Sequence, residues 1–393
     1  MALSATIFIT LNSTKNRTNI ASYSLNWNVF FNNFYNFAPW SVLLNGKIMD
    51  VKFFKGVLSD SYAGDSGCYF RDETTTDEAQ LVVVSAPWSV TADFGKGSAY
   101  APDAIIDASA RGGVYDAISH LSLEGKIATA EIDYNIQELS GQLGREAERV
   151  ASHIEDNGEL VGDKMLARVA RIDSGFEEMQ SSIYAQVLRH AKAGKRIAVI
   201  GGDHSVAFGA VKALSEQHKD MGILAIDAHA DLRQSTSPYR YSHDSIMRNV
   251  VEEIPAISKV VEVGVRDVVS EEMEFASANP KVEIFFAEEL AARMFEGSCW
   301  QALCDEICSK LPQKVYISLD IDALKIEFCH NTNFPVPGGL NFNEVVYLID
   351  RVVATGHQIV GFDITEVVPN IDNTMDSTVA TRLLSKMAIT TLK

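Results

Sequence analysis

The chain of 393 residues lacks any apolar run that approaches the ~18 consecutive residues of a membrane-spanning helix. Its first eleven residues lean towards apolar side chains, but they lack the positively charged region that opens a secretory signal. The sequence therefore predicts no membrane partner and no secretory signal.

Cysteine is also scarce, and no two cysteines have the C-x-x-C spacing of a redox or zinc motif. An odd number without such a pair is typical of reduced thiols, so we expect a cytoplasmic protein. Cys304 and Cys308 are four residues apart on a predicted helix and are expected to share its buried face. The five cysteines are Cys68, Cys299, Cys304, Cys308 and Cys329.

Basic residues are few relative to acidic ones, because 34 Lys and Arg face 52 Asp and Glu, for a formal net charge of −18. An excess of negative charge argues against nucleic acid or an anionic membrane as the main partner. The same sign is compatible with a small cationic substrate, although it also simply favours solubility.

Acidic residues are absent from residues 1–48, which contain nine Asn and no Asp or Glu. Met49 then opens a segment that could itself begin a protein, so residues 1–48 are either a genuine extension or the product of a start codon placed upstream. Their many aromatic side chains predict a segment that packs on something, such as a neighbouring subunit. The predicted organisation is an extension, residues 1–48, followed by one domain, residues 49–393.

The glycine pattern of a Rossmann nucleotide fold, G-x-G-x-x-G after the first strand, is absent as well. After residue 80, short runs rich in Val and Ile alternate with helix-length segments, which predicts an α/β domain with a buried parallel sheet. The predicted strands are residues 81–85, 196–200, 222–226, 259–265, 282–286, 314–319 and 357–362. The clearest predicted helices are residues 176–193, 205–219 and 341–355.

Three of the predicted strands run into short motifs that are rich in acids and histidines. The motifs are Gly-Gly-Asp-His-Ser at 201–205, Asp-Ala-His-Ala-Asp at 227–231 and Asp-Ile-Asp at 320–322. They supply six side chains of metal-ligand type: His204, Asp227, His229, Asp231, Asp320 and Asp322. The carboxyl ends of parallel strands meet at one edge of the sheet, and alternate residues of an extended segment point to one side, so we expect these side chains to converge.

Four converging carboxylates would repel one another unless cations balanced their charge. Two divalent metal ions would supply that balance, and imidazole with carboxylate suits manganese, iron, cobalt or nickel better than a metal that prefers thiolates. The sequence therefore predicts a binuclear metal centre. A set of helix caps and salt-bridged acids is the alternative interpretation.

These three motifs, intact and in this order, resemble those of the ureohydrolase family, the arginases, agmatinases and their relatives. The resemblance covers roughly residues 80–393 and implies a three-layer α/β/α fold with an eight-stranded, mainly parallel sheet. It implies that one metal is held by His204, Asp227, Asp231 and Asp320. It implies that the second metal is held by His229, Asp227, Asp320 and Asp322, with Asp227 and Asp320 bridging the two.

Further positions match the family pattern, namely His243, Glu366 and the Pro-x-Pro-Gly-Gly-Leu run at 335–340. The resemblance implies hydrolysis of a C–N bond in a guanidinium group. In that reaction Glu366 would bind the planar cation, together with His243, and Asp231 would pass a proton to the leaving nitrogen. His243 would also exchange protons with solvent.

The chain also departs from the family pattern around the expected pocket. Lys325 and Ile326 stand where the family has Asp-Pro, bulky residues at 328–334 replace a glycine-rich loop, and Val269 stands where arginases have an acid that recognises the amino-acid head group. A narrower pocket without that acid suits a substrate with little or no tail.

These features resemble the nickel-dependent guanidine hydrolases of cyanobacteria, so we expect hydrolysis of free guanidine to urea and ammonia, with Ni²⁺ preferred and Mn²⁺ as the alternative. An agmatinase or another guanidino-acid hydrolase is the alternative function. A non-catalytic scaffold would have lost ligands, and a zinc deacetylase would hold a single metal. The resemblance also implies a homo-oligomer, either a trimer or a hexamer, and a metal-delivery chaperone is a further expected partner.

Overall fold

The computed structural model describes residues 67–91, 97–234, 238–370 and 372–393, and of the first 66 residues only four short strands. These strands pair as two antiparallel hairpins and are β1 (Thr6–Ile9), β2 (Ala21–Ser24), β3 (Ser41–Leu44) and β4 (Lys47–Asp50). The chain divides into two compact units, Met1–Ala63 and Gly64–Lys393. The predicted boundary between residues 48 and 49, and the packing predicted for residues 1–48, fall outside the fully described residues and stay predictions.

The second unit is built on an eight-stranded sheet in which every neighbouring pair of strands is parallel. The order across the sheet is β12-β11-β10-β13-β14-β9-β5-β8. The strands are β5 (Leu81–Ala86), β8 (Ile127–Thr129), β9 (Arg196–Gly201), β10 (Met221–Ile226), β11 (Ile257–Val265), β12 (Val282–Phe286), β13 (Lys314–Asp320) and β14 (Gln358–Thr365). A small antiparallel pair, β6 (Tyr115–Asp116) with β7 (Leu121–Ser122), lies outside it. All predicted strands are confirmed, whereas the three-residue edge strand β8 was too short to predict.

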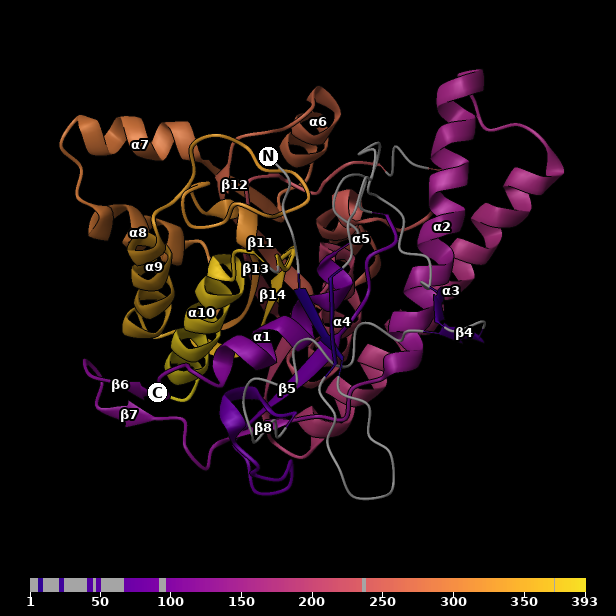
Figure 1. Cartoon of the computed structure of the whole chain (residues 1–393). Coiled ribbons are helices and arrows are strands. Elements are labelled where there is room, and N and C mark those ends of the chain that lie inside the picture. Colours follow the sequence, from indigo (N-terminus) through magenta and orange to yellow (C-terminus); the bar gives the residue numbers. More distant parts are fainter. Residues whose placement is uncertain are drawn as a thin grey trace. The chain divides into compact units, whose positions relative to one another are not determined.

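Helices cover both faces of this sheet and produce three layers (Figure 1). One face packs against α2 (Tyr134–Asn157), α3 (Asp163–Lys192), α4 (Ala207–Gln217), α5 (Ile246–Glu253) and α6 (Ser270–Ala278). The other face packs against α1 (Ala101–Ser109), α7 (Ala287–Phe295), α8 (Trp300–Ser309), α9 (Phe342–Ala354) and α10 (Met375–Thr391). Strands that are buried on both faces need the near-continuous Val and Ile runs of the sequence, so the predicted three-layer fold is confirmed.

The predicted helices are present with one wrong boundary. Residues 341–355 match α9, and residues 205–219 begin with a short 3₁₀ turn at His204–Val206 before α4. The helix predicted at 176–193 begins instead at Asp163, because its first half pairs with α2 along an exposed hairpin and carries too few apolar residues to stand out. Cys304 and Cys308 are both buried on α8, as predicted.

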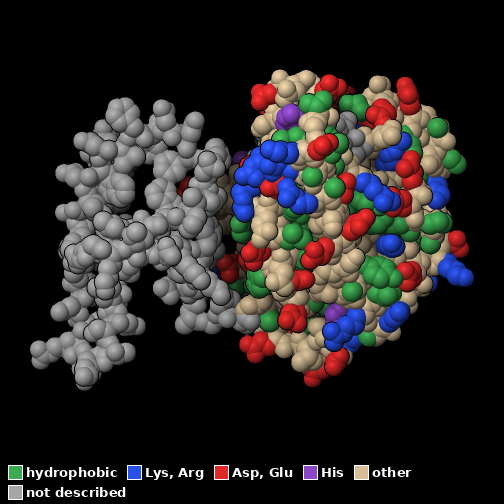
Figure 2. Space-filling model, turned by 90° about the vertical axis from the view of Figure 1, so that its right-hand side faces the viewer, with side chains coloured by type: hydrophobic (Ala, Val, Ile, Leu, Met, Phe, Trp, Pro, Cys, Tyr) green, Lys and Arg blue, Asp and Glu red, His purple; other side chains and the backbone are tan. Residues whose placement is uncertain are grey.

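The side of the molecule that carries α2 and α3 has a mixed surface (Figure 2). Acidic and basic side chains alternate over the part of this face that the structure describes, and hydrophobic side chains are scattered between them. Glu146 of α2, for example, is paired with Arg149, Arg168 and Arg171. Among the described residues, no helix has the length and apolar character that crossing a membrane requires.

The four central strands decide where a site can form. β10, β13, β14 and β9 are consecutive neighbours in the sheet, and each is followed directly by residues of the motifs predicted from the sequence. The chain therefore brings those residues together at the carboxyl edge of the sheet, where ligands bind in open α/β sheets.

Candidate metal centre

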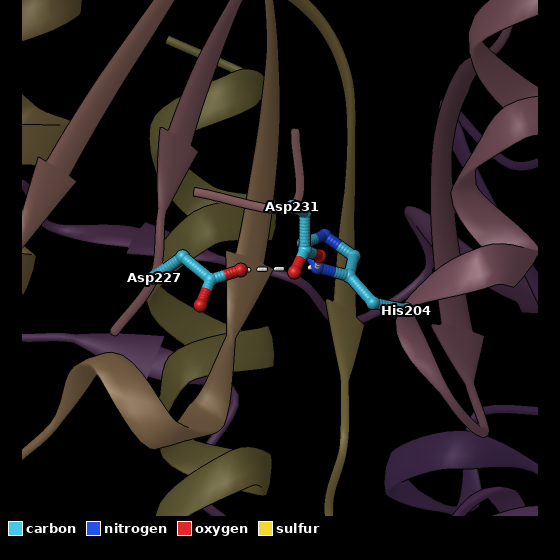
Figure 3. Close-up of side chains that lie close together, drawn as sticks. All are labelled: His204, Asp227 and Asp231. Carbon is cyan, nitrogen blue, oxygen red and sulfur yellow. Dashed lines mark ion pairs between the residues drawn. The ribbon is translucent and has the colours of Figure 1, made fainter. Parts of the chain in front are cut away.

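His204 lies at the centre of the first group of candidate ligands (Figure 3). It follows β9, it is 1% exposed, and its Nδ1 atom lies 3.0 Å from Asp227 Oδ2 and 2.8 Å from Asp231 Oδ2. Asp320 Oδ2 lies somewhat farther from the same nitrogen, at 3.7 Å. Three carboxylates from two strand ends therefore converge on one imidazole nitrogen.

The other nitrogen of His204 shows why Nδ1 can bind a metal. Nε2 lies 2.9 Å from Ser318 Oγ, and that hydroxyl donates to the Asp363 carboxylate at 3.0 and 2.9 Å. Since the Ser318 proton is committed to Asp363, Nε2 donates to Ser318 Oγ, and Nδ1 is the nitrogen that faces the carboxylates. Nδ1 is buried without a hydrogen-bond partner among the described residues and faces carboxylate oxygens, so this set of side chains fits a cation.

A second group is formed by Asp227, His229 and Asp322. His229 Nδ1 lies 3.0 Å from Asp322 Oδ2 and 3.6 Å from Asp227 Oδ1. Asp227 thus belongs to both groups and presents one carboxylate oxygen to each histidine. This arrangement suits two neighbouring cations that share a carboxylate.

Backbone amides orient these carboxylates. Asp227 Oδ1 accepts the His229 N–H at 2.7 Å, Asp322 Oδ1 accepts the Ala228 N–H at 3.1 Å, and Asp320 Oδ1 accepts the Asp322 N–H at 2.9 Å. In Asp320 and Asp322 one oxygen is therefore held by the backbone, while the other faces a histidine. Such hydrogen bonds hold the ligands in place before any ion arrives.

The expectation that these motifs are extended is wrong, although their side chains do converge. Asp231 has a left-handed backbone with φ of 52°, and Asp322 lies in a 3₁₀ turn at Ile321–Ala323. The motifs stand just beyond the strands, where the backbone leaves the pleat. The turn at Asp231 brings its carboxylate onto His204, whereas simple alternation would have placed it beside His229.

Burial and like charge shift the pKa values of these groups. Burial and the neighbouring Asp227 charge raise the pKa of Asp231 to about 7, in spite of His204. The pKa of Asp320 is raised well above its usual range by burial and by the charges of Asp322 and Asp227. Crowded carboxylates that resist ionisation together are the ones a divalent cation stabilises.

Glu366 follows β14 and lies next to this cluster. It is 3% exposed, and its left-handed backbone, with φ of 62°, turns the chain as it leaves the strand. Oε1 accepts the His204 N–H at 2.8 Å, and Oε2 accepts a hydrogen bond from the side chain of Asn333. Burial raises the pKa of Glu366 to about 8, against the opposing charge of His243. A fixed carboxylate here can bind a cation that approaches the metal centre.

His243 is half-buried and lies in a 3₁₀ turn before α5. Its Nδ1 lies 3.1 Å from Thr91 Oγ1, and its ring stacks on Phe334 with a centroid distance of 5.6 Å and an angle of 11°. Burial lowers its pKa, but the charges of Asp244, Glu366, Asp203 and Asp231 outweigh burial and raise the value above the usual one. The acids around the ring therefore favour its charged form.

Sequence reasoning missed several residues that the structure brings to the site. Ser318 and Asp363 lie on adjacent strands, and Asn333 comes from the loop after the third motif. Glu262 of β11 is buried, and its carboxyl oxygens have no hydrogen-bond partner among the described residues. Burial, followed by the charges of Asp227 and Asp231, raises its pKa well above the usual range. A single acid inside an apolar run was the one signal that could have revealed it.

Removing the Ser318 hydroxyl tests whether the hydrogen bond between Ser318 Oγ and His204 Nε2 supports metal binding. Ser318→Ala is expected to weaken metal affinity by roughly 10–100-fold, because His204 loses the partner that sets its tautomer. Competition with a chelator measures the affinity, and Ser309→Ala, at an exposed position, is the matched control. Equal metal affinity in both variants would contradict the role assigned to Ser318.

Comparison with known proteins agrees with the fold and with the family that the motifs resemble. A family profile described as "Arginase family" matches residues 79–390. An N(1)-aminopropylagmatine ureohydrolase of Thermus thermophilus is 30% identical over 299 residues, which are 76% of this chain and 86% of that protein. An agmatinase of Bacillus anthracis is 24% identical over 324 residues, 82% of this chain and 94% of that protein.

Solved structures show the same fold. The agmatine ureohydrolase of Thermoplasma volcanium, 24% identical in sequence, matches with a TM-score of 0.60 over 81% of this chain and 92% of its own. Proclavaminate amidino hydrolase of Streptomyces clavuligerus, 22% identical, matches with a TM-score of 0.61 over 82% of this chain and 96% of its own. The chain belongs to the arginase family, the ureohydrolases, as the three motifs predicted.

Proposed function

We propose that the chain hydrolyses a guanidinium C–N bond with two divalent metal ions, and that free guanidine, converted to urea and ammonia, is its substrate. The observation that carries this proposal is the pair of His–Asp groups that share Asp227, with the buried carboxylate of Glu366 on the same sheet edge. Membership of the arginase family supports the reaction class.

The two metal sites follow from the two groups of side chains. His204, Asp227, Asp231 and Asp320 would hold one ion, and His229, Asp227, Asp320 and Asp322 would hold the other. When bound, the ions neutralise the carboxylates and lower the pKa of a water towards neutrality, which supplies the nucleophile. Ni²⁺ is the proposed metal and Mn²⁺ the alternative, since imidazole and carboxylate accept both.

Three side chains would handle the substrate and its protons. Glu366 binds the cation through a charge-assisted pair, which places the guanidinium carbon beside the centre. Asp231, which lies beside the metal centre, passes a proton to the leaving nitrogen. His243, which is half-buried, exchanges protons with solvent.

The choice of free guanidine depends on the walls of the pocket. Phe334 contacts two of the three histidines of the site: its ring stacks on that of His243 at a centroid distance of 5.6 Å and is edge-on to that of His229 at 6.2 Å. Val269, an apolar residue, stands where an arginase has an acid for the substrate's head group. Both features favour a substrate without a tail. Agmatine or a related guanidino compound is the second candidate, which the names of the matched relatives favour.

A substrate panel separates these candidates. We expect the nickel-loaded protein to release urea from guanidine at least about 10-fold faster than from agmatine or arginine at equal concentration, a difference of about 1.4 kcal/mol in barrier. The panel is repeated with manganese, and urea is measured directly. Fast urea release from agmatine with none from guanidine would overturn the choice of substrate, while leaving the reaction class intact.

A further inference from the structure

The loop after the third motif contributes directly to the pocket. Asn333 donates to Glu366 Oε2, so the amide lies against the carboxylate that is proposed to bind the guanidinium. The next residue, Phe334, lies with its ring nearly parallel to that of His243 and edge-on to that of His229. Two consecutive side chains of one loop therefore border the place where the substrate would sit.

This part of the loop is held by α10 and by the segment that follows β14. Asp376, in the first turn of α10, is fully buried and accepts the His330 N–H at 2.8 Å and the Asn331 side-chain N–H at 2.5 Å. The Asn331 carbonyl accepts the Val368 N–H at 3.0 Å. Because the chain is anchored just before Asn333, that side chain and Phe334 are fixed in position over the site.

The side-chain oxygen of Asn333 has no hydrogen-bond partner among the described residues. Its side chain is 3% exposed and its Nδ2 is used on Glu366, yet its Oδ1 is buried without a partner among the described residues. A buried carbonyl oxygen without a donor costs free energy, so a site that leaves one open beside a carboxylate is suited to a ligand rich in N–H groups. Guanidinium has only N–H donors to offer and needs acceptors on each of its edges.

Phe334 limits what can be attached to that ligand. An aromatic ring stacked against His243 fills space that an alkyl chain leaving the guanidinium would need, and it replaces that space with apolar surface unsuited to a charged tail. Free guanidinium has no alkyl chain and does not need that space.

We propose that Asn333 and Phe334 select an unsubstituted guanidinium: Asn333 Oδ1 accepts an N–H of the cation whose other edge Glu366 binds, and Phe334 closes the path of a tail. This inference rests on the proposed function and adds to it the residues that determine which substrate is accepted. An N-alkyl group on the nitrogen facing Asn333 removes a donor and meets the ring of Phe334.

The first test is Phe334→Gly, measured on guanidine, methylguanidine and agmatine. We expect the ratio of kcat/KM for agmatine over guanidine to rise on the order of 10–100-fold over that of the unmodified protein, as a steric barrier is removed. Phe328→Ala is the matched control, since Phe328 belongs to the same loop but lines a separate cavity with Phe342 and Met375. Phe334→Leu is the second variant, made because glycine could destabilise the loop. It should give a smaller rise in the same ratio.

Asn333→Ala supplies an independent readout. We expect kcat/KM for guanidine to fall on the order of 10–100-fold and the preference for guanidine over methylguanidine to shrink, since an acceptor specific for the unsubstituted nitrogen is lost. If Asn333 has a purely structural role, the variant should lower kcat/KM for guanidine and for methylguanidine by the same factor. That result would overturn the assignment of Oδ1.

The results separate the two proposals. If the unmodified protein cleaves guanidine and Phe334→Gly and Phe334→Leu keep its substrate ratios, this inference fails and the proposed function stands. If the unmodified protein cleaves agmatine but not guanidine, free guanidine fails as the substrate, and Phe334 excludes no tail. If it cleaves no guanidino compound with either metal, the proposed function itself fails and this inference with it.

Discussion

Asp227→Asn is expected to abolish turnover, with a loss on the order of 10³-fold or more, because this carboxylate faces both histidines of the centre. The amide keeps the size of the side chain and can still accept the His229 N–H, which Asp227 Oδ1 does at 2.7 Å. It removes the negative charge that two cations would share. The expected metal content therefore falls from two ions per chain to less than one.

Metal analysis of the purified protein and urea release together check this result. Asp305→Asn is the matched control, because Asp305 pairs with Arg351 on the surface of α8 and lies outside the centre. A surface pair of this kind contributes little, so the control should keep its metal and its activity. An Asp227→Asn protein that retains two ions and near-normal turnover would contradict the assignment of the centre.

Glu366→Gln is expected to lower kcat/KM by about 10²–10³-fold, since removing one partner of a buried, hydrogen-bonded charge pair costs about 2–5 kcal/mol. Glutamine can still accept the His204 N–H at Oε1, so the turn after β14 should survive. The other end of its amide would face the Asn333 donor, which already points at Oε2. The guanidinium cation then meets no countercharge.

Steady-state kinetics on guanidine, with metal content measured in parallel, tests this prediction. The loss should appear with two ions per chain still bound, which separates binding of the substrate from binding of metal. Glu288→Gln on the exposed first turn of α7 is the matched control and should behave as the unmodified protein. Loss of metal together with activity would show that Glu366 supports the centre and does not bind substrate.

Much of the fold could be predicted because its strands are buried on both faces. Such strands need continuous apolar runs, and the run at Leu81–Ala86, in which every residue is buried, is readable without any tertiary information. The ligand positions were predictable for a related reason. Asp227 stands immediately after such a run and His204 a short turn after another, and parallel strands place their carboxyl ends at one edge. Local sequence was therefore sufficient to predict the position of a residue that follows a strand directly, because the end of the strand fixes where that residue lies.

Local backbone geometry beyond the strand ends was not predictable. Alternation describes an extended chain, whereas Asp231 has a positive φ and Asp322 lies in a 3₁₀ turn. The first half of α3 and the edge strand β8 were missed because they are either exposed or very short, so they lack a continuous apolar pattern.

By itself, the sequence determined the three-layer fold and the convergence of the candidate metal ligands, because both follow from short patterns and from strand polarity. Only the tertiary structure decided which side chains form hydrogen bonds with the residues of the site. His204 meets Ser318 across 114 residues of chain, and Asn333 meets Glu366 across 33. Contacts between segments so far apart depend on how loops and strands pack in three dimensions, and no pattern within either segment specifies its partner.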